Sequence, residues 1–147
     1  MYQLAKLLMP NELIYFDSQI ELTLLALCVW GEARGESETG KAAVAHVVMN
    51  RYLLQKSTFG MTVREVILKP FQFSFFNPRP EWGRKLITDL RESTAWEACV
   101  FAAWEAYLGI TDDPTGGATH YHNNSCSPKW TKELTKTITI GNHIFYR

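Results

Sequence analysis

The sequence has no excess of charge of either sign. Its 147 residues include 15 Lys and Arg against 15 Asp and Glu, so the net charge is zero with neutral histidine. Proteins that bind duplex nucleic acid usually carry a basic surplus that neutralises phosphate groups. The composition therefore gives no reason to expect a nucleic-acid partner.

Cysteine is scarce, and long apolar runs are missing. The three cysteines, Cys28, Cys99 and Cys126, are an odd number, which excludes a complete disulfide framework. No stretch reaches the roughly 18 apolar residues of a membrane-spanning helix, so we expect no membrane span. Met1–Met9 has Lys6 in its middle and lacks the basic start and apolar run of a signal peptide. We therefore expect synthesis in the cytoplasm without a signal peptide.

The sequence also lacks internal repeats, low-complexity tracts and long linkers. A chain of this length suffices for one domain with its own core and is short for two. Apolar residues make up 46% and charged residues 20%, which is ordinary for a globular protein. Aromatic residues make up 13%, and they fit either a core or a groove that stacks on sugar rings. We expect a single domain over residues 1–147 and a monomer.

Residues that can cap helices divide the first half of the chain. Ser18–Glu21 has the form of a capping box, which predicts the start of a helix. Ser37 can cap a second helix that runs to about Leu54. Thr62–Glu65 is another capping box, and the short helix that it opens should end at Pro70.

Two more helices are predicted over residues 81–91 and 94–108, after an aromatic loop over 71–80 that proline residues interrupt. Gly109 is placed to end the second of them. Apolar residues at helical spacing predict the faces that the first and last helices bury. These residues are Ile20, Leu24, Leu27 and Cys28 in the first helix and Trp96, Cys99, Val100, Ala103, Trp104 and Tyr107 in the last.

The last third of the chain changes in character. Residues 112–117 predict a tight loop, and 118–123 an extended segment. Alternating patterns over 136–140 and 143–146 predict two strands, and Gly141–Asn142 fits the turn between them. The predicted fold class is therefore α+β, with a mainly helical body and a small C-terminal β-hairpin.

Glu32 is the first candidate for chemistry. It continues the predicted apolar face of the first helix, near a helix end where Gly31 and Gly35 can loosen or stop the helix. A carboxyl group buried without a partner keeps its proton more readily, because its ionised form loses hydration. Such an acid can protonate the leaving oxygen of a glycosidic bond. From spacing alone, a structural ion pair with Arg34 or Arg51 is the favoured alternative.

Two other kinds of site are compatible with this sequence. His120, His122 and His143, with Cys126, could supply nitrogen and sulfur ligands to zinc. Their spacing matches none of the usual zinc signatures, so we predict no metal and no cofactor. The other alternative is a nucleophilic Cys126 beside His120 or His122, although this thiol lies in a loop rather than at an activating helix N-terminus.

Five blocks of motif-like sequence follow one another within residues 20–147. They are Trp30–Ser37 with Gly40–Arg51; Val66, Pro70 and Phe71–Ser74; Asp113–Ala118; Tyr121 and Asn123 with Pro128–Trp130; and Ile140–Tyr146. Together they resemble the cell wall hydrolase family typified by the spore cortex-lytic enzyme SleB. The resemblance implies a lysozyme-like, lytic-transglycosylase-like catalytic domain that cleaves the MurNAc–GlcNAc glycan of peptidoglycan.

The resemblance also assigns roles to residues. The family's catalytic acid is the first glutamate of the Gly-Glu-Ala-Arg-Gly-Glu motif, which matches Glu32. The residues expected to bind the glycan strand are Gln72, Phe73, Ser74, Gly116, Gly117, Ala118, Tyr121, Asn123 and Trp130. Those expected to support the site are Glu36, His143 and Phe145, with His143 more structural than catalytic.

The chain departs from the family in the segment His120–Asn124, where members usually carry a Phe-Tyr-Asn-Pro-like stretch, and in the insertion-like Ser125–Ser127. These differences alter the expected groove wall and leave the exact substrate open. A bare catalytic domain resembles phage lysis enzymes and virion-associated murein hydrolases, so we expect action on the cell wall after phage delivery. The alternatives in other classes are a zinc-dependent N-acetylmuramoyl amidase and a non-catalytic peptidoglycan-binding module.

We expect the reaction to be that of a lytic transglycosylase, which needs one carboxyl group. Glu32 would first give a proton to the glycosidic oxygen and then take one from the C6 hydroxyl of the sugar. A second carboxylate within roughly 5–10 Å would instead allow hydrolysis. Asp112 and Asp113 are the candidates for it, although neither is obviously paired with Glu32 in the sequence.

Overall fold

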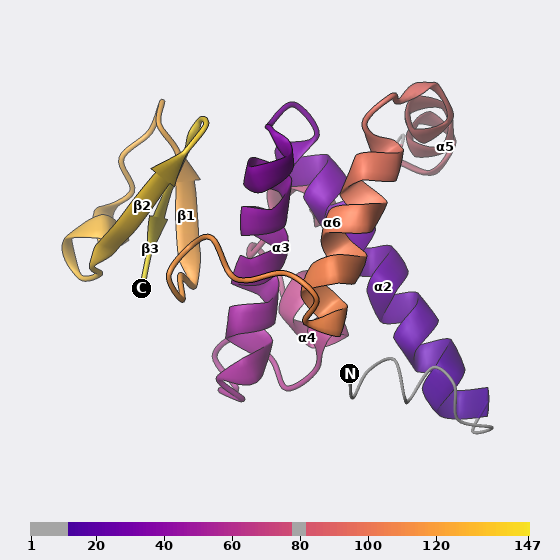
Figure 1. Ribbon diagram of the computed structural model, residues 1–147, viewed down its shortest axis with the longest axis horizontal. Coiled ribbons are helices and arrows are strands. Elements are labelled where there is room, and N and C mark those ends of the chain that lie inside the picture. Colours follow the sequence, from indigo (N-terminus) through magenta and orange to yellow (C-terminus); the bar gives the residue numbers. More distant parts are fainter. Residues whose placement is uncertain (1–11, 78–81) are drawn as a thin grey trace.

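The computed structural model describes residues 12–77 and 82–147. Residues 1–11, the end of the aromatic loop and Glu81 lie outside these residues. A helical body forms one side of the molecule, and a three-stranded sheet lies beside it (Figure 1). This arrangement confirms the predicted α+β class.

Three helices form the centre of the helical body: α2 (Glu12–Ala33), α3 (Glu38–Leu53) and α6 (Trp96–Leu108). They pack against one another, and the short α4 (Val63–Leu68) closes one side of α2 and α3. The shared core includes the fully buried Leu25, Val29, Val44, Val48, Cys99 and Ala103. Burial of each larger aliphatic side chain contributes about 1.5–3 kcal/mol to folding.

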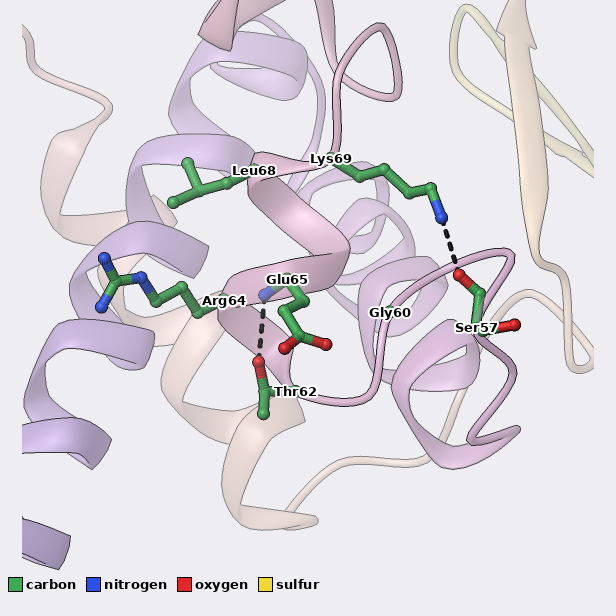
Figure 2. A pocket seen from close by; sticks show the side chains of 7 residues that line it. All are labelled: Ser57, Gly60, Thr62, Arg64, Glu65, Leu68 and Lys69. Carbon is green, nitrogen blue, oxygen red and sulfur yellow. Dashed lines mark hydrogen bonds between the residues drawn. The ribbon is translucent and has the colours of Figure 1, made fainter.

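Two predicted caps are present. The Ser37 hydroxyl accepts a hydrogen bond from Gly40 N at 3.2 Å at the start of α3. The Thr62 hydroxyl accepts one from Glu65 N at 3.1 Å at the start of α4 (Figure 2). The Glu65 carboxylate accepts from Met61 N at 2.7 Å, so it binds the residue before the cap instead of the Thr62 N–H that a complete capping box would use.

The predicted start of the first helix is wrong. Helix α2 begins by Glu12, and Ser18 is buried within it. Tyr107 of α6 explains the difference, because its hydroxyl donates to Glu21 Oε2 at 2.8 Å and also hydrogen-bonds Ser18. Ser18 and Glu21 therefore link α2 to α6 through hydrogen bonds and do not cap the start of α2.

The predicted buried faces are correct in part. In α2 the predicted Cys28 is buried, but Ile20 is 46% exposed, and Leu22, Leu25 and Ala26 are buried as well. In α6 the predicted Cys99, Ala103 and Tyr107 are buried, but Trp104 is 44% exposed, and the small residues Ala102 and Ala106 are buried as well. Small side chains allow α6 to approach α2 and α3 closely, which spacing rules based on large apolar residues do not detect.

The remaining helical elements are the 3₁₀ turn η1 (Ser74–Phe76) and α5 (Trp82–Glu92). The predicted loop over 71–80 thus contains a short turn of helix. Gly109 adopts a left-handed conformation with φ 68° and ends α6, as predicted.

The sheet contains β1 (His120–Asn123), β2 (Lys136–Ile140) and β3 (His143–Tyr146), with η2 (Lys129–Lys132) between β1 and β2. The strands are antiparallel in the order β1-β3-β2, so β1 adds a third strand to the predicted hairpin. Side chains alternate between the two faces of the sheet. Phe145, on the inner face, packs with Ala43 and Val47 of α3.

Among the residues described, no helix combines the length and the apolar character needed to cross a bilayer.

Candidate functional site

Glu32 lies in the last turn of α2 and is partly buried. Its Oε1 accepts hydrogen bonds from Ser74 Oγ at 3.3 Å and from Phe75 N at 3.2 Å. Its Oε2 accepts one from the Tyr121 hydroxyl at 3.0 Å. Donors from η1 and β1 therefore converge on one carboxyl group at the junction of the helical body and the sheet.

The sequence left open a structural ion pair between Glu32 and Arg34 or Arg51, and this pair does not form. The Arg34 guanidinium lies over the Trp30 ring, 4.7 Å from its centroid, and donates to main-chain oxygens of α2. Arg51 is buried and donates to Thr119 O at 2.6 Å and to Gln72 Oε1 at 3.1 Å. Glu32 has no basic partner within the described part of the chain.

Gly31 positions the loop that binds Glu32. A Cβ atom at this position would overlap the Phe75 ring, so only glycine lets η1 lie so close to α2. The Phe75 ring also meets the edge of Trp30, with 5.9 Å between ring centroids. Sequence reasoning attributed Gly31 to a loosened helix and missed Phe75. The glycine inside a long helix was the available signal, because such a residue often marks a close approach.

Tyr121 reaches Glu32 from the inner face of the sheet. Its ring contacts those of His143 and Phe145, with centroid distances of 4.9 and 5.7 Å. Burial raises the pKa of the Tyr121 phenol well above its usual value, and the nearby Glu32 carboxylate raises it further. Tyr121 therefore keeps its proton and can either donate or accept a hydrogen bond at Glu32.

Arg51 joins the two segments that contact Glu32. Its hydrogen bonds to Gln72 and Thr119 connect the residues just before η1 with those just before β1. Its guanidinium also lies between the rings of Phe59 and Phe73, 5.3 and 5.2 Å from their centroids. Gln72 and Phe73 were predicted to bind substrate. Here Phe73 is buried and Gln72 braces Arg51, so their visible role is to fix the loop.

Glu36 supports the site from a distance. Its two carboxylate oxygens accept hydrogen bonds from Asn142 N at 3.1 Å and Asn142 Nδ2 at 3.0 Å. Burial pushes the pKa of Glu36 up, but the Asn142 hydrogen bonds and the charges of His143 and Lys41 outweigh it, and the net shift is downward. The pair ties the turn after α2 to the β2–β3 turn.

His143 and Phe145 lie behind Tyr121 on β3. Phe145 is fully buried, and His143 is 6% exposed. Burial lowers the pKa of His143, although the Glu36 and Glu32 carboxylates oppose this shift. His143 Nδ1 is buried without a hydrogen-bond partner among the described residues.

The side chain of Asp113 holds the loop Gly116–Ala118 through hydrogen bonds. Asp113 accepts four hydrogen bonds, from Thr115 N and Oγ1, Gly117 N and Asn50 Nδ2. Burial alone would raise the pKa of Asp113, but these donors lower it. Both oxygens of Asp113 are thereby engaged in fixing the loop. Ala118 is fully buried, and its carbonyl accepts from Asn50.

Two predicted substrate-binding residues lie elsewhere. Trp130 packs against His120, His122 and Tyr146, at centroid distances of 5.2, 5.7 and 5.3 Å. These partners project from the outer face of the sheet, whereas Tyr121 projects from the inner face. Asn123 is exposed, and its side chain accepts from Ser125 N. Neither contacts Glu32.

The same alternation separates the histidines proposed as zinc ligands. His120 and His122 lie on the outer face and His143 on the inner face, because β1 and β3 pair in a fixed register. Over residues 12–77 and 82–147, no three His, Cys, Asp or Glu side chains are grouped as metal ligands.

Cys126 and His122 do meet, with Sγ 3.9 Å from Nδ1. That nitrogen also lies 2.8 Å from Asn123 O, which can only accept, so Nδ1 carries the proton. The thiol likewise donates to Asn123 O at 3.3 Å. His122 Nδ1 is therefore not available as a base for Cys126.

Glu32 does not line either of two hollows beside the helical body. One, of about 610 Å³, lies beside α4 and includes Arg64, Leu68 and Lys69, whose ammonium group donates to Ser57 O at 2.7 Å (Figure 2). The other, of about 430 Å³, lies between α3 and α6. The converging donors define the site at Glu32.

Comparison with known proteins gives the family. The family model described as Cell Wall Hydrolase matches residues 35–146. The chain belongs to this family. The spore cortex-lytic enzyme of Halalkalibacterium halodurans is 36% identical over 132 residues, covering 89% of this chain and 35% of that protein. The Bacillus cereus spore cortex-lytic enzyme is 34% identical over 131 residues, covering 87% of this chain and 44% of that protein.

Two solved structures of this cell wall hydrolase family share the fold. The catalytic domain of Bacillus cereus SleB superposes with a TM-score of 0.66 at 32% identity, covering 88% of this chain and 91% of that domain. The catalytic domain of SleB from Bacillus anthracis, described as a germination-specific lytic transglycosylase, gives a TM-score of 0.65 at 31% identity, covering 88% and 95%. The chain spans less than half the length of the curated relatives it matches.

Proposed function

We propose that this chain cleaves the MurNAc–GlcNAc backbone of peptidoglycan as a lytic transglycosylase, with Glu32 as its only acid and base. The observation that carries the proposal is the carboxyl group of Glu32, held by donors from two segments that lie far from it in sequence. Family membership and the names of the relatives, which include a spore cortex-lytic enzyme and a lytic transglycosylase, support the substrate and the reaction.

The two oxygens of Glu32 are suited to different tasks. Phe75 N is a main-chain donor and can only donate, so Oε1 must stay an acceptor. The Tyr121 hydroxyl at Oε2 can donate to a carboxylate or accept from a carboxylic acid. Oε2 can therefore carry the catalytic proton without breaking the contact that orients the group.

The reaction then runs in two steps. Glu32 gives the Oε2 proton to the glycosidic oxygen, and the C1–O bond of MurNAc breaks as the sugar gains oxocarbenium character. The Glu32 carboxylate next takes the proton from the C6 hydroxyl of the same sugar, whose oxygen bonds to C1. The products are a 1,6-anhydro-MurNAc end and a free GlcNAc hydroxyl, the enzyme regains its proton, and no water is consumed.

The hydrogen bonds that Glu36 and Asp113 accept support a mechanism with one catalytic carboxyl group. Both oxygens of Glu36 accept hydrogen bonds from Asn142, and both oxygens of Asp113 hold the loop that precedes β1. A hydrolytic mechanism needs a second carboxylate that is free to activate water or attack the sugar. The oxygens of Glu36 and Asp113 are occupied by these structural hydrogen bonds.

The decisive experiment is Glu32→Gln. The amide keeps an acceptor for Phe75 N but has no proton to donate, so clearing of purified sacculi should fall by at least about 100-fold. Glu38→Gln, an exposed position in the first turn of α3, is the matched control and should clear sacculi like the wild type. Turbidity is followed with and without EDTA. An active, folded Glu32→Gln protein would refute the assignment, and EDTA-sensitive release of peptides would favour a zinc amidase.

Mass spectrometry of the digested sacculi identifies the reaction. Transglycosylation yields anhydro-muropeptides whose mass lacks one water relative to the products of hydrolysis. Reducing ends would show that water is the acceptor and that a second base takes part. Binding to sacculi without any cleavage would instead indicate a non-catalytic module.

We also propose that this activity serves lysis or penetration of a bacterial wall after phage-linked delivery. The similarity to cortex-lytic enzymes supports a role in breaking down a wall. The purified chain, added to cells from outside or directed to the wall from within, should lyse them. Lysis that does not depend on Glu32 would contradict the proposal.

A further inference from the structure

Phe71 combines two unfavourable properties in one residue. Its side chain is 88% exposed, the highest exposure of any large apolar side chain that the structure describes. Its backbone has φ 63°, in the left-handed region that side chains bearing a Cβ rarely adopt. Scattered exposed apolar residues are common, and so are left-handed turn residues, but an exposed aromatic ring on a strained backbone is not.

The local turn explains which residue would be expected at this position. Gln72 N donates to Lys69 O at 3.2 Å, which closes a four-residue turn with Pro70 and Phe71 in its centre. A proline followed by a residue of positive φ is the pattern of a type II turn, in which glycine or asparagine normally takes the second central place. The chain has phenylalanine there, so the turn alone does not account for the ring.

The turn leads directly into the segment that holds Glu32. After Phe71 come Gln72, which contacts Arg51, then buried Phe73, and then Ser74, which donates to Glu32. Three residues of extended chain span at most about 11 Å. The backbone of Phe71 therefore lies within that distance of Ser74, and a glycan strand bound at Glu32 is a polymer long enough to extend past it.

From this geometry we infer that Phe71 is a substrate-contacting residue that stacks against a pyranose ring of the glycan strand, at a sugar beyond the bond that is cleaved. The inference rests on the proposed function and adds a specificity-determining contact to it. An aromatic ring offers a flat apolar surface that matches the C–H face of a sugar. The hydrogen-bonded turn fixes the backbone at Phe71 before substrate arrives, which lowers the entropy lost on binding. Strain kept at a ligand-binding position fits this role.

The test separates the ring from the backbone strain. Phe71→Asn removes the ring and places a residue tolerant of left-handed φ in the turn. We expect KM for glycan strands stripped of stem peptides to rise about tenfold, while the melting midpoint stays equal or rises. Phe71→Trp should restore most of the lost affinity. Gln55→Asn is the matched control, because Gln55 is also exposed with φ 50° but lies away from Glu32, and its KM should equal that of the wild type.

Binding without catalysis provides an independent readout. Co-sedimentation with sacculi compares Glu32→Gln with the double variant Glu32→Gln/Phe71→Asn, and the double variant should bind about tenfold more weakly. An unchanged KM and equal co-sedimentation would overturn the inference, as would a lower kcat at constant KM. A loss seen with sacculi but not with stripped glycan strands would assign Phe71 to the stem peptide and also overturn it. If the wild type cleaves nothing, the proposed function fails, and co-sedimentation still decides the role of Phe71.

Discussion

At the scale of single residues, Tyr121 is the side chain that hydrogen-bonds the second oxygen of Glu32. The Tyr121 hydroxyl donates to Oε2 of Glu32. Burial raises the pKa of the Tyr121 phenol well above its usual value, and the Glu32 carboxylate raises it further. Because this phenol stays protonated, its hydroxyl can donate to the Glu32 carboxylate or, after its O–H bond rotates, accept from the Glu32 carboxylic acid. The position of the acid then stays the same throughout the reaction.

Tyr121→Phe should therefore lower kcat by about 10- to 100-fold, since a hydrogen bond to a charged group contributes about 1.5–3 kcal/mol. Its melting midpoint should fall by only a few degrees, because the hydrogen bond is lost while the ring stays packed. The matched control is Tyr146→Phe, which removes a hydroxyl 3.2 Å from His122 Nε2 on the outer face. Steady-state kinetics on sacculi would show equal losses for both variants if Tyr121 had no special role at Glu32.

At the scale of secondary-structure elements, the site depends on how closely η1 approaches α2. Gly31→Ala places a methyl group inside the Phe75 ring, so the loop must move and withdraw Phe75 N from Glu32. We expect a loss of about 1–3 kcal/mol in the free energy of unfolding, together with a lower kcat. Gly83→Ala in α5, where a Cβ meets open space, should instead stabilise the protein by about 0.5–1 kcal/mol. Urea unfolding and turbidity assays measure both. A stable, active Gly31→Ala protein would contradict the packing argument.

Glu36 connects two turns, and its contribution should depend on pH. Because the pKa of Glu36 in the folded state lies below the usual 4.5, its stabilising effect is complete above that value and is lost as pH falls through the folded pKa. Glu36→Ala should cost about 1 kcal/mol at pH 7, since the Asn142 hydrogen bonds are lost. The difference in the free energy of unfolding between Glu36→Ala and wild type should become smaller as the pH falls below 4.5. Urea unfolding across this range checks the trend, with the exposed Glu133→Ala as control, and a pH-independent difference would rule out ionisation as its source.

At the scale of the whole molecule, the sequence predicted what depends on local chemistry. The caps at Ser37 and Thr62 and the turn at Gly141 were correct, because each depends on residues within a few positions. The surroundings of Glu32 were not predictable in this way. Its donors lie 42, 43 and 89 residues further along the chain, and no local rule places them. Glu32 was a candidate from its position on the helix, and Ser74 and Tyr121 were named through family resemblance. Phe75 contributes a main-chain group that any residue type could supply.

Three histidines that burial keeps from charging should make the whole fold sensitive to acid: His46 and His143 are buried, and His120 is partly buried. Burial lowers the pKa of His46, His120 and His143 below the usual 6.5. As pH falls below about 6.5 the unfolded chain binds these protons before the folded protein does, so stability decreases. The melting midpoint should be flat above about pH 7.5 and decline steadily below about pH 6.5. A midpoint constant down to about pH 5.5 would show that these side chains are not shielded from water.

Because side chains alternate between the two faces of the sheet, the pairing register limits where residues can be inserted into or deleted from this chain. Tyr121 reaches Glu32 because β1 pairs with β3 in one register, with Tyr121 opposite Phe145. A slip by a single residue would turn Tyr121 outward and present an imidazole to the acid instead. Insertions or deletions in the short connection before β1 should therefore be tolerated far less than amino-acid replacements, even though that connection contains no group that takes part in bond cleavage.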